Sequence, residues 1–229
     1  MSHVVVQVAM DEEAQPFLDA ASEVSEPVQI GRAIHRGVVV GGRTFVLVRS
    51  GIGMVNAAVA AVGSAHRYGD DILLISAGSA GGLGPGVQVG DIVVGTQYIN
   101  VDADAQAFGY VPGQVPGMPP SYAPDPFAHA ALITAALADG RGREGAIGSG
   151  EKFVTVDIAH RLREVFPAIL AVDMETAALA QTAFNLGLRF ASLRAISDLC
   201  APDGTEFETH IDDAAERSAQ VVLAALAQL

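Results

Sequence analysis

The chain has 229 residues, of which half are hydrophobic and 17% are charged, and this composition excludes a disordered chain or a highly charged linker. Its 13 basic and 26 acidic residues give a net charge of −13 at pH 7, and the resulting repulsion disfavours nucleic acid and anionic membranes as partners. The length predicts one domain, residues 1–229, with a sizeable core. Because Cys200 is the only cysteine, an intramolecular disulfide is excluded, and a cytoplasmic location fits best.

The predicted strands are short runs rich in β-branched residues, and the first of them opens the chain. Residues 4–9 are apolar, but the run is too short to span a bilayer, and it lacks the preceding basic region of a signal peptide. Two Val-rich runs around Gly41-Gly42 predict a hairpin over residues 37–48. Further buried strands are predicted at residues 44–48, 72–76, 92–94, 169–172 and 188–196.

Longer segments rich in alanine lie between these runs and predict helices at residues 54–66, 127–137, 158–165 and 176–186. The last segment is the clearest helix, because small and apolar residues recur at the three-and-four spacing of one face: Ile211, Ala214, Ala215, Ser218, Val221, Val222, Ala225, Leu226 and Leu229. Strands that alternate with helices indicate an α/β domain with a largely parallel sheet. Residues 101–126, rich in proline and aromatic residues, predict a long loop, which is typical of a lid or a subunit contact.

Three acidic residues follow predicted strands. Glu13 follows residues 4–9, Glu175 follows residues 169–172, and Asp198 follows residues 188–196. In an open parallel sheet the ligand site lies beyond the carboxyl ends of the strands, so these acids are candidates for one pocket. Each acid taken alone is better explained by the preference of carboxylates for the first turn of a helix.

Two glycine turns at residues 50–53 and 78–82, the second containing Ser79 and Gly81, also follow strands, and Arg194 lies nearby in the sequence. Glycines let backbone amides approach a ligand closely. Together with the three acids, these turns predict a pocket that stabilises a developing positive charge or holds sugar hydroxyls.

Other kinds of site are not supported by the sequence. No GxGxxG follows a strand, and Lys152, the only lysine, has no phosphate-binding loop around it. The six histidines show no metal-ligand spacing, and no serine lies in a GxSxG turn. Cys200 has no identified histidine partner, which favours an inert thiol over a nucleophile.

Several of these motifs, in this order along the chain, resemble those of the methylthioadenosine/S-adenosylhomocysteine nucleosidases. The similar segments are MDEE at residues 10–13, SGIG at 50–53, GSAGG at 78–82, VGDIVV at 89–94, DAD at 102–104, AFGY at 107–110, VDME at 172–175 and RAISD at 194–198. The resemblance implies a single-domain purine nucleoside phosphorylase-like α/β fold, with a central, mostly parallel mixed sheet flanked by helices. It also implies a homodimer that hydrolyses the N-glycosidic bond of a 5′-thio-substituted adenosine without a cofactor or metal.

The same resemblance implies roles for individual residues. Asp198 would be the general acid at purine N7, and Glu13 would position and deprotonate the attacking water. Glu175 would bind the ribose hydroxyls beside Met174, with Ser79, Arg194 and Ser197 as supporting polar groups. Phe153 would stack on the base, the Val154 backbone would read its edge, and the pocket for the 5′-substituent would comprise Met10, Ile52, Phe108, Tyr110, Pro116 and Phe207, some of them from the partner subunit.

Three alternatives remain open on the sequence. A phosphorylase of the same superfamily would use phosphate, although an acid at the phosphate position is repulsive. A non-catalytic nucleoside-binding protein is also possible on this fold, but binding a neutral nucleoside needs no trio of acids. A related nucleosidase that acts on 6-amino-6-deoxyfutalosine would share the same three acids.

Overall fold

The central sheet has the strand order β2-β4-β5-β1-β6-β11-β7-β10-β9-β8, with β3 beside β4. This computed structural model describes residues 3–201 and 203–229. The strands are β1 His3–Val8, β2 Glu23–Val24, β3 Val28–Ile30, β4 Ala33–Val40, β5 Arg43–Arg49, β6 Ile72–Ser76, β7 Ser79–Gly82, β8 Ile92–Asn100, β9 Gly142–Ser149, β10 Ile169–Asp173 and β11 Arg189–Asp198.

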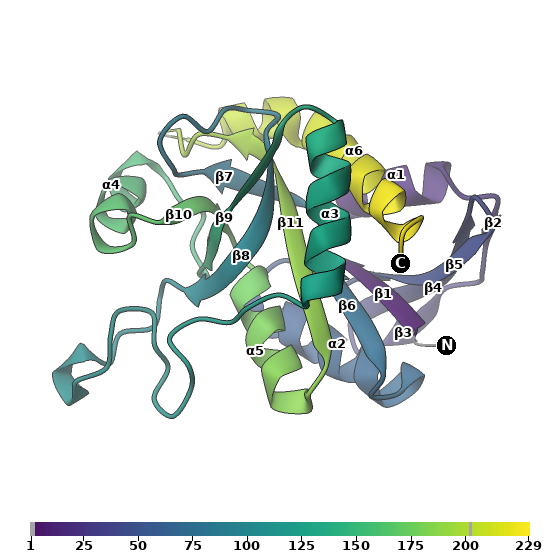
Figure 1. The fold of residues 1–229 in the computed structure, drawn as a ribbon, viewed down its shortest axis with the longest axis horizontal. Helices are drawn as coiled ribbons and strands as arrows, with labels where there is room; N and C mark the ends of the chain where they lie inside the picture. The colour runs from purple at the N-terminus through teal and green to yellow at the C-terminus, as the bar shows by residue number, and fades with distance from the viewer. Residues whose placement is uncertain (1–2, 202) are drawn as a thin grey trace.

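The helices cover both faces of this sheet (Figure 1). They are α1 Asp11–Asp19, α2 Met54–Tyr68, α3 Pro126–Ala138, α4 Val156–Val165, α5 Thr176–Leu186 and α6 Thr205–Leu226, with a short 3-10 helix, η1, at Gln106–Phe108. Helices α1 and α3 pack against α6 on one face, and α2 packs against α5 on the other. The prediction of an α/β fold with a mixed sheet flanked by helices is confirmed.

The middle of the sheet is parallel, as the buried apolar runs predict. Strand β1 pairs in parallel with β5 and β6, and β11 pairs in parallel with β6 and β7. Strand β11 also pairs with β8, antiparallel, so that β8, β9, β10, β7 and β11 close into a ring. The antiparallel β4–β5 pair is the predicted hairpin, with Gly41 and Gly42 at positive φ in its turn.

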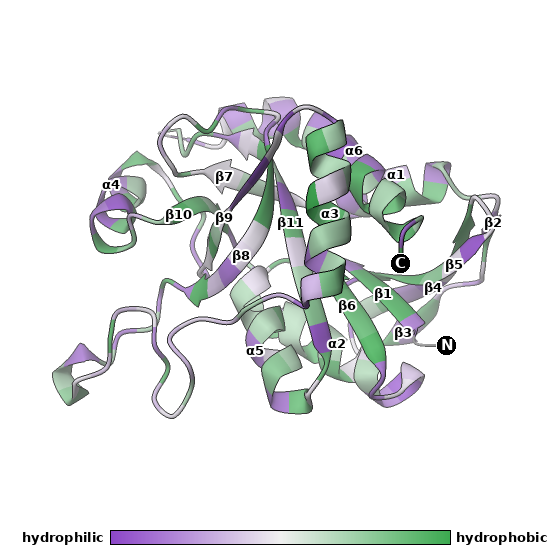
Figure 2. Ribbon diagram, viewed as in Figure 1, coloured by the Kyte–Doolittle hydropathy of each residue, from purple (hydrophilic) through white to green (hydrophobic). Residues whose placement is uncertain are grey.

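Apolar side chains of the central strands alternate between two large cores, one on each face of the sheet, and a third, smaller cluster lies between β9, β10 and α4. On β6, Leu73 and Ile75 pack with α1, α3 and α6, whereas Ile72 and Leu74 pack with α2 and α5. This arrangement explains why the strands are apolar without a polar face. Figure 2 shows the result, with hydrophobic colour along the central strands and hydrophilic residues on the outer turns of the helices.

The structure extends some predicted elements and adds others that the sequence did not predict, namely α1, β2, β3, β7, β9 and η1. The predicted strand at residues 92–94 is only the start of β8, and Leu229, predicted on the buried face of the last helix, lies beyond its end and is 40% exposed. Helix α1 was missed because it is short, begins with three acids and contains Pro16. Strands β7 and β9 were missed because glycine makes up much of both.

Glycines are required in β9 because it packs unusually closely. A Cβ on Gly145 would lie 2.3 Å from Leu170 Cδ1, and one on Gly142 would lie 2.6 Å from the backbone carbon of Ala136 in α3. Neither separation is physically possible without a shift of the neighbour. The strand therefore depends on close contact with β10 and α3, which local sequence propensity does not reveal.

The predicted long loop is confirmed between β8 and α3, where η1 is the only helix. Figure 1 shows this teal segment projecting away from the sheet. Tyr122 forms an isolated bridge with Tyr98 of β8, and Phe108 at the end of η1 is 84% exposed. No helix in the described part of the chain has the length and apolar character needed to cross a membrane.

Candidate active site

A cavity opens at the ends of β1, β10 and β11, where the predicted acids meet. Its walls come from segments distant in sequence, as expected for a site at the carboxyl edge of parallel strands. The lining residues are Ala9, Met10, Glu13, Ile52, Ser79, Ala80, Gly81, Lys152, Phe153, Val154, Val172, Asp173, Met174, Glu175, Ser197, Asp198 and Phe207.

Glu13 is buried in this cavity and held by four donors. Its Oε2 accepts from the amides of Ala9 and Met10 at 2.8 and 3.2 Å, and its Oε1 accepts from the amide and hydroxyl of Ser79 at 2.9 and 3.0 Å. The backbone at Gly78 lies very close to this carboxylate. A Cβ on Gly78, whose φ is 145°, would lie 2.4 Å from Glu13 Oε1.

The turn between Gly78 and Ser79 therefore fixes the position of the Glu13 carboxylate. The amide and hydroxyl of Ser79 donate to one oxygen of Glu13, while the amides of Ala9 and Met10, which follow β1, donate to the other. These four donors fill the roughly four acceptor positions of a carboxylate. Rotation of the Ser79 hydroxyl frees one position on Oε1, where Glu13 can orient a water molecule and take a proton from it.

Glu175 lies opposite, at the N-terminus of α5. Its Oε1 accepts from the amide of Gly53 at 2.9 Å, and its Oε2 lies 3.9 Å from Arg194 Nη2. Burial raises the pKa of Glu175 to about 8, and the charges of Asp173 and Glu13 add to this, whereas Arg194 and the Gly53 amide lower it. The carboxyl group is thus poised to change its protonation state near neutral pH.

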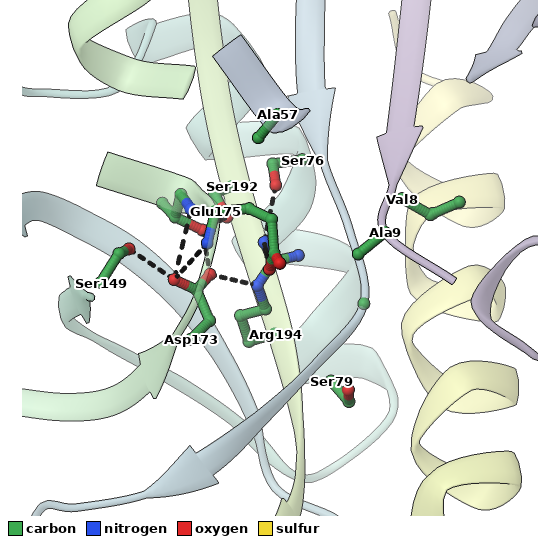
Figure 3. Close-up of polar contacts among 12 residues, drawn as sticks. Val8, Ala9, Ala57, Ser76, Ser79, Ser149, Asp173, Glu175, Ser192 and Arg194 are labelled. Atoms are coloured by element: carbon green, nitrogen blue, oxygen red, sulfur yellow. Dashed lines mark hydrogen bonds and ion pairs between the residues drawn. The ribbon is translucent and has the colours of Figure 1, made fainter. Parts of the chain in front are cut away.

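Arg194 is not part of the cavity wall, although it was predicted as a site residue. It is buried beneath the cavity, where Nε donates to Asp173 Oδ2 at 2.5 Å and Nη2 donates to Ser76 Oγ at 2.8 Å (Figure 3). Ser149 and Thr176 also donate hydroxyl hydrogens to Asp173. Arg194 therefore acts on the cavity through the carboxylates above it.

Asp198 ends β11 and is buried. Burial raises its pKa, and Glu206 adds to this, whereas hydrogen bonds from the Cys200 amide at 2.9 Å and the Ser197 hydroxyl at 2.9 Å lower it. The raised pKa favours a protonated carboxyl group, which is the form that can donate a proton. Burial raises the pKa of the neighbouring Cys200 thiol to about 12, so that it is uncharged near neutral pH.

Two aromatic rings stand together in the cavity wall. Phe153 and Phe207 meet edge to face, with ring centroids 5.8 Å apart, and Phe153 is 42% exposed. A core position for Phe153 is therefore excluded, and its free face can stack on a planar ligand. Met10, Ile52 and Met174 add apolar surface.

The structure brings twelve predicted residues to the cavity wall but leaves four outside it. Arg194 lies beneath the wall, and Phe108, Tyr110 and Pro116 lie on the projecting loop. Two charged lining residues were not predicted: Lys152, which pairs with Asp102 at 3.1 Å, and Asp173. The sequence carried a signal for Asp173, because it follows the strand at residues 169–172 more directly than Glu175 does.

The residues that line the cavity do not suggest a metal centre. Within residues 3–201 and 203–229, no three His, Cys, Asp or Glu side chains are grouped in a way that could hold a metal ion. The only cation in the cavity wall is Lys152, and it is paired.

Comparison with known proteins identifies the family. The model of the phosphorylase superfamily matches residues 3–227. A 5′-methylthioadenosine/S-adenosylhomocysteine nucleosidase of Chromohalobacter salexigens is 37% identical over 235 residues, covering 100% of this chain and 98% of the relative. This chain belongs to the methylthioadenosine/S-adenosylhomocysteine nucleosidase family.

Solved structures of the nucleosidase family agree with the fold. The nucleosidase of Neisseria meningitidis, in complex with methylthio-immucillin-A, is 36% identical and superposes with a TM-score of 0.94, each chain being covered completely. A futalosine hydrolase of Helicobacter pylori, 24% identical, has the same fold with a TM-score of 0.91, and the alignment covers 100% of this chain and 98% of that one. The fold is therefore shared by nucleosidases whose names indicate different substrates.

Proposed function

We propose that this protein hydrolyses the N-glycosidic bond of 5′-methylthioadenosine and S-adenosylhomocysteine, releasing adenine and the corresponding thioribose. The observation that carries this proposal is the convergence of Glu13, Glu175 and Asp198 on one cavity. Cleavage of a ribosyl C–N bond develops positive charge on the sugar, which carboxylates stabilise, and negative charge on the purine, which an acid neutralises.

Asp198 is the proton donor in this proposal. As the bond between C1′ and N9 breaks, its electron pair moves into the purine, and N7 accepts the proton of the Asp198 carboxyl group. Burial favours the neutral carboxyl group that this step needs. Ser197, which donates to Asp198, orients it.

Glu13 activates the water that attacks C1′. The water oxygen forms the new bond to C1′, and Glu13 takes a proton from it, so that the sugar leaves as a neutral hydroxyl compound. Four hydrogen bonds from the ends of β1 and the 78–79 turn support this role, because they fix the carboxylate before substrate binds.

Binding of the nucleoside uses the remaining lining residues. Glu175 accepts hydrogen bonds from the ribose hydroxyls beside Met174, and Ser79 and Arg194 hold the two carboxylates in place. Phe153 stacks on adenine, and the backbone of Val154 and the close-packed Gly81 border the base. Met10, Ile52 and Phe207 form the apolar wall for the 5′-substituent.

The projecting loop completes this wall from a second copy of the chain. Phe108, Tyr110 and Pro116 do not line the cavity of their own chain, and the exposure of the Phe108 ring is typical of a contact surface. We therefore propose a homodimer in the cytoplasm, each subunit being one domain of residues 1–229, in which the loop of each subunit covers the cavity of the other.

The charges that line this cavity disfavour the binding of phosphate as the nucleophile. The Glu13 carboxylate faces the cavity, and the one cation among its lining residues, Lys152, is already paired with Asp102. A phosphate dianion would be repelled by this carboxylate and would meet no free cation among the lining residues. Hydrolysis is therefore favoured over phosphorolysis.

The test is to incubate the purified protein with methylthioadenosine, S-adenosylhomocysteine, 6-amino-6-deoxyfutalosine and inosine, with and without phosphate, and to identify the sugar product. Adenine and free methylthioribose, formed without phosphate, are the expected products. A sugar 1-phosphate would instead identify a phosphorylase. Release only from the futalosine compound would change the substrate, and binding without turnover would identify a binding protein.

A further inference from the structure

A second, open groove adjoins the catalytic cavity. It is lined by Ala9, Met10, Asp11, Glu12, Gln29, Arg32, Ile34, Arg49, Ser50, Gly51, Ile52 and Asn56. Three of these residues, Ala9, Met10 and Ile52, also line the catalytic cavity, so the two hollows share one wall. The shared wall contains the apolar residues assigned above to the 5′-substituent.

The character of the lining changes from apolar to charged beyond this shared wall. Arg49 ends β5 and Arg32 precedes β4, while Asp11 and Glu12 begin α1. The groove thus holds both guanidinium and carboxylate groups. Two cations and two anions are complementary to a zwitterion, and a bare anion or cation would meet repulsion from half of them.

The guanidinium of Arg49 forms one salt bridge and keeps donors for a second partner. Its Nε lies 3.0 Å from Asp11 Oδ1, and the side chain is 32% exposed. This is the one salt bridge of Arg49 among the described residues, and it leaves both Nη groups for a second carboxylate. The two amides of the groove are engaged elsewhere, because Asn56 donates to Ile52 O and Gln29 donates to Gly31 O.

We propose that this groove is a subsite for the α-amino acid end of a 5′-thio substituent, in which Arg49 binds the carboxylate and Glu12 binds the ammonium group. The inference rests on the proposed function, which places the sulfur substituent against Met10 and Ile52. A homocysteinyl chain continues from that sulfur for two methylene groups before its charged end, whereas a methylthio group ends at the shared wall. The subsite therefore contributes to the binding of S-adenosylhomocysteine and makes no contact with methylthioadenosine.

The test combines two variants with four substrates. The substrates are methylthioadenosine, S-adenosylhomocysteine, its analogue without the carboxylate (5′-(3-aminopropylthio)-5′-deoxyadenosine) and its analogue without the ammonium group (5′-(3-carboxypropylthio)-5′-deoxyadenosine). Arg49→Met removes the proposed carboxylate partner, and Glu12→Gln removes the proposed ammonium partner. Arg43→Met is the matched control, because Arg43 lies on the same strand outside the groove, where it donates to Ala227 O.

Each variant has its own expected pattern of kcat/KM. Arg49→Met lowers it about three- to tenfold for the two substrates that carry a carboxylate, as expected for a partly exposed charged pair, and leaves the other two within about twofold. Glu12→Gln lowers it similarly for the two that carry an ammonium group. Arg49→Lys restores most of the loss, and Arg43→Met changes none of the ratios.

Equal losses on all four substrates, or an unchanged ratio of S-adenosylhomocysteine to methylthioadenosine in both variants, would overturn the subsite. In either case, hydrolysis of methylthioadenosine by the unmodified protein would leave the proposed function intact. If the unmodified protein hydrolysed none of the four compounds, the proposed function itself would fail, and the subsite with it. Thermal unfolding of Arg49→Met and Glu12→Gln shows whether a loss reflects unfolding.

Discussion

Arg194 and Asp173 form a buried ion pair beneath the cavity, with Nε 2.5 Å from Oδ2 and side-chain exposures of 3% and 1%. The same guanidinium reaches Glu175 at 3.9 Å. Asp173 therefore partly neutralises Arg194, and this pairing weakens the support that Arg194 gives to the ionised form of Glu175, whose pKa is raised mainly by burial. The two carboxylates compete for one cation.

Asp173→Asn tests this pair through stability. The substitution leaves the buried guanidinium without its strongest partner, and loss of one member of such a pair costs about 3 kcal/mol of unfolding free energy. Urea unfolding at pH 7 measures the change. The control is Asp91→Asn, since Asp91 pairs with the partly exposed Arg143 and leaves the cavity untouched. A loss no greater than that of the control would show that the buried pair contributes little.

Glu13→Gln separates water activation from binding. Both oxygens of Glu13 accept hydrogen bonds from N–H groups, so the amide NH2 of glutamine would face a donor on either side. We expect kcat for methylthioadenosine to fall about 10²- to 10⁴-fold, the usual contribution of a general base, with KM within about threefold. Asp19→Asn, on the exposed end of the same helix, should have normal kinetics. A substantial residual kcat would remove Glu13 from the role of base.

Asp198→Asn tests the proton donor, and the pH dependence of the unmodified protein supports the assignment. Burial raises the pKa of Asp198, so its protonated form persists to higher pH than in an ordinary aspartate. Activity should decline as pH rises through that raised value, because the donor form is lost. Asp198→Asn should retain nucleoside binding, measured by calorimetry, and lose turnover. An alkaline decline that persists in a weakly active Asp198→Asn protein would assign it to another group.

Glu175 should make stability fall with rising pH. Its pKa in the folded protein is about 8, above the ordinary value of 4.5. Between these values the folded protein holds a proton that the unfolded chain has released, so this contribution is complete below pH 4.5 and is lost as pH rises to about 8.

Glu175→Gln removes this dependence. The difference in unfolding free energy between the unmodified protein and the variant should therefore shift in favour of the variant between pH 5 and pH 8.5. Glu164→Gln, an exposed change on α4, controls for surface charge. A constant difference across this range would show that the pKa of Glu175 is not raised in the folded protein.

The sequence by itself determined the α/β class, the parallel centre of the sheet and the convergence of three acids. These features depend on local signals, because apolar runs mark buried strands and the carboxyl ends of parallel strands share one edge. Glu13, Glu175 and Asp198 could be identified by reading the polar residue after each run. The resemblance to a family added the apolar and aromatic lining.

Only the tertiary structure decided how these groups are held and which of them act together. Arg194 lies beneath the cavity instead of in its wall, and Asp173, two residues from Glu175, binds it. The glycine-rich strand β9 and the groove beside Met10 likewise arise from contacts between segments far apart in the chain. Such contacts leave no periodic pattern in the sequence, because each depends on the position of a distant strand or helix in the folded structure. Propensity and spacing describe neighbours along the chain, whereas burial, ion pairing and shared walls are set by neighbours in space.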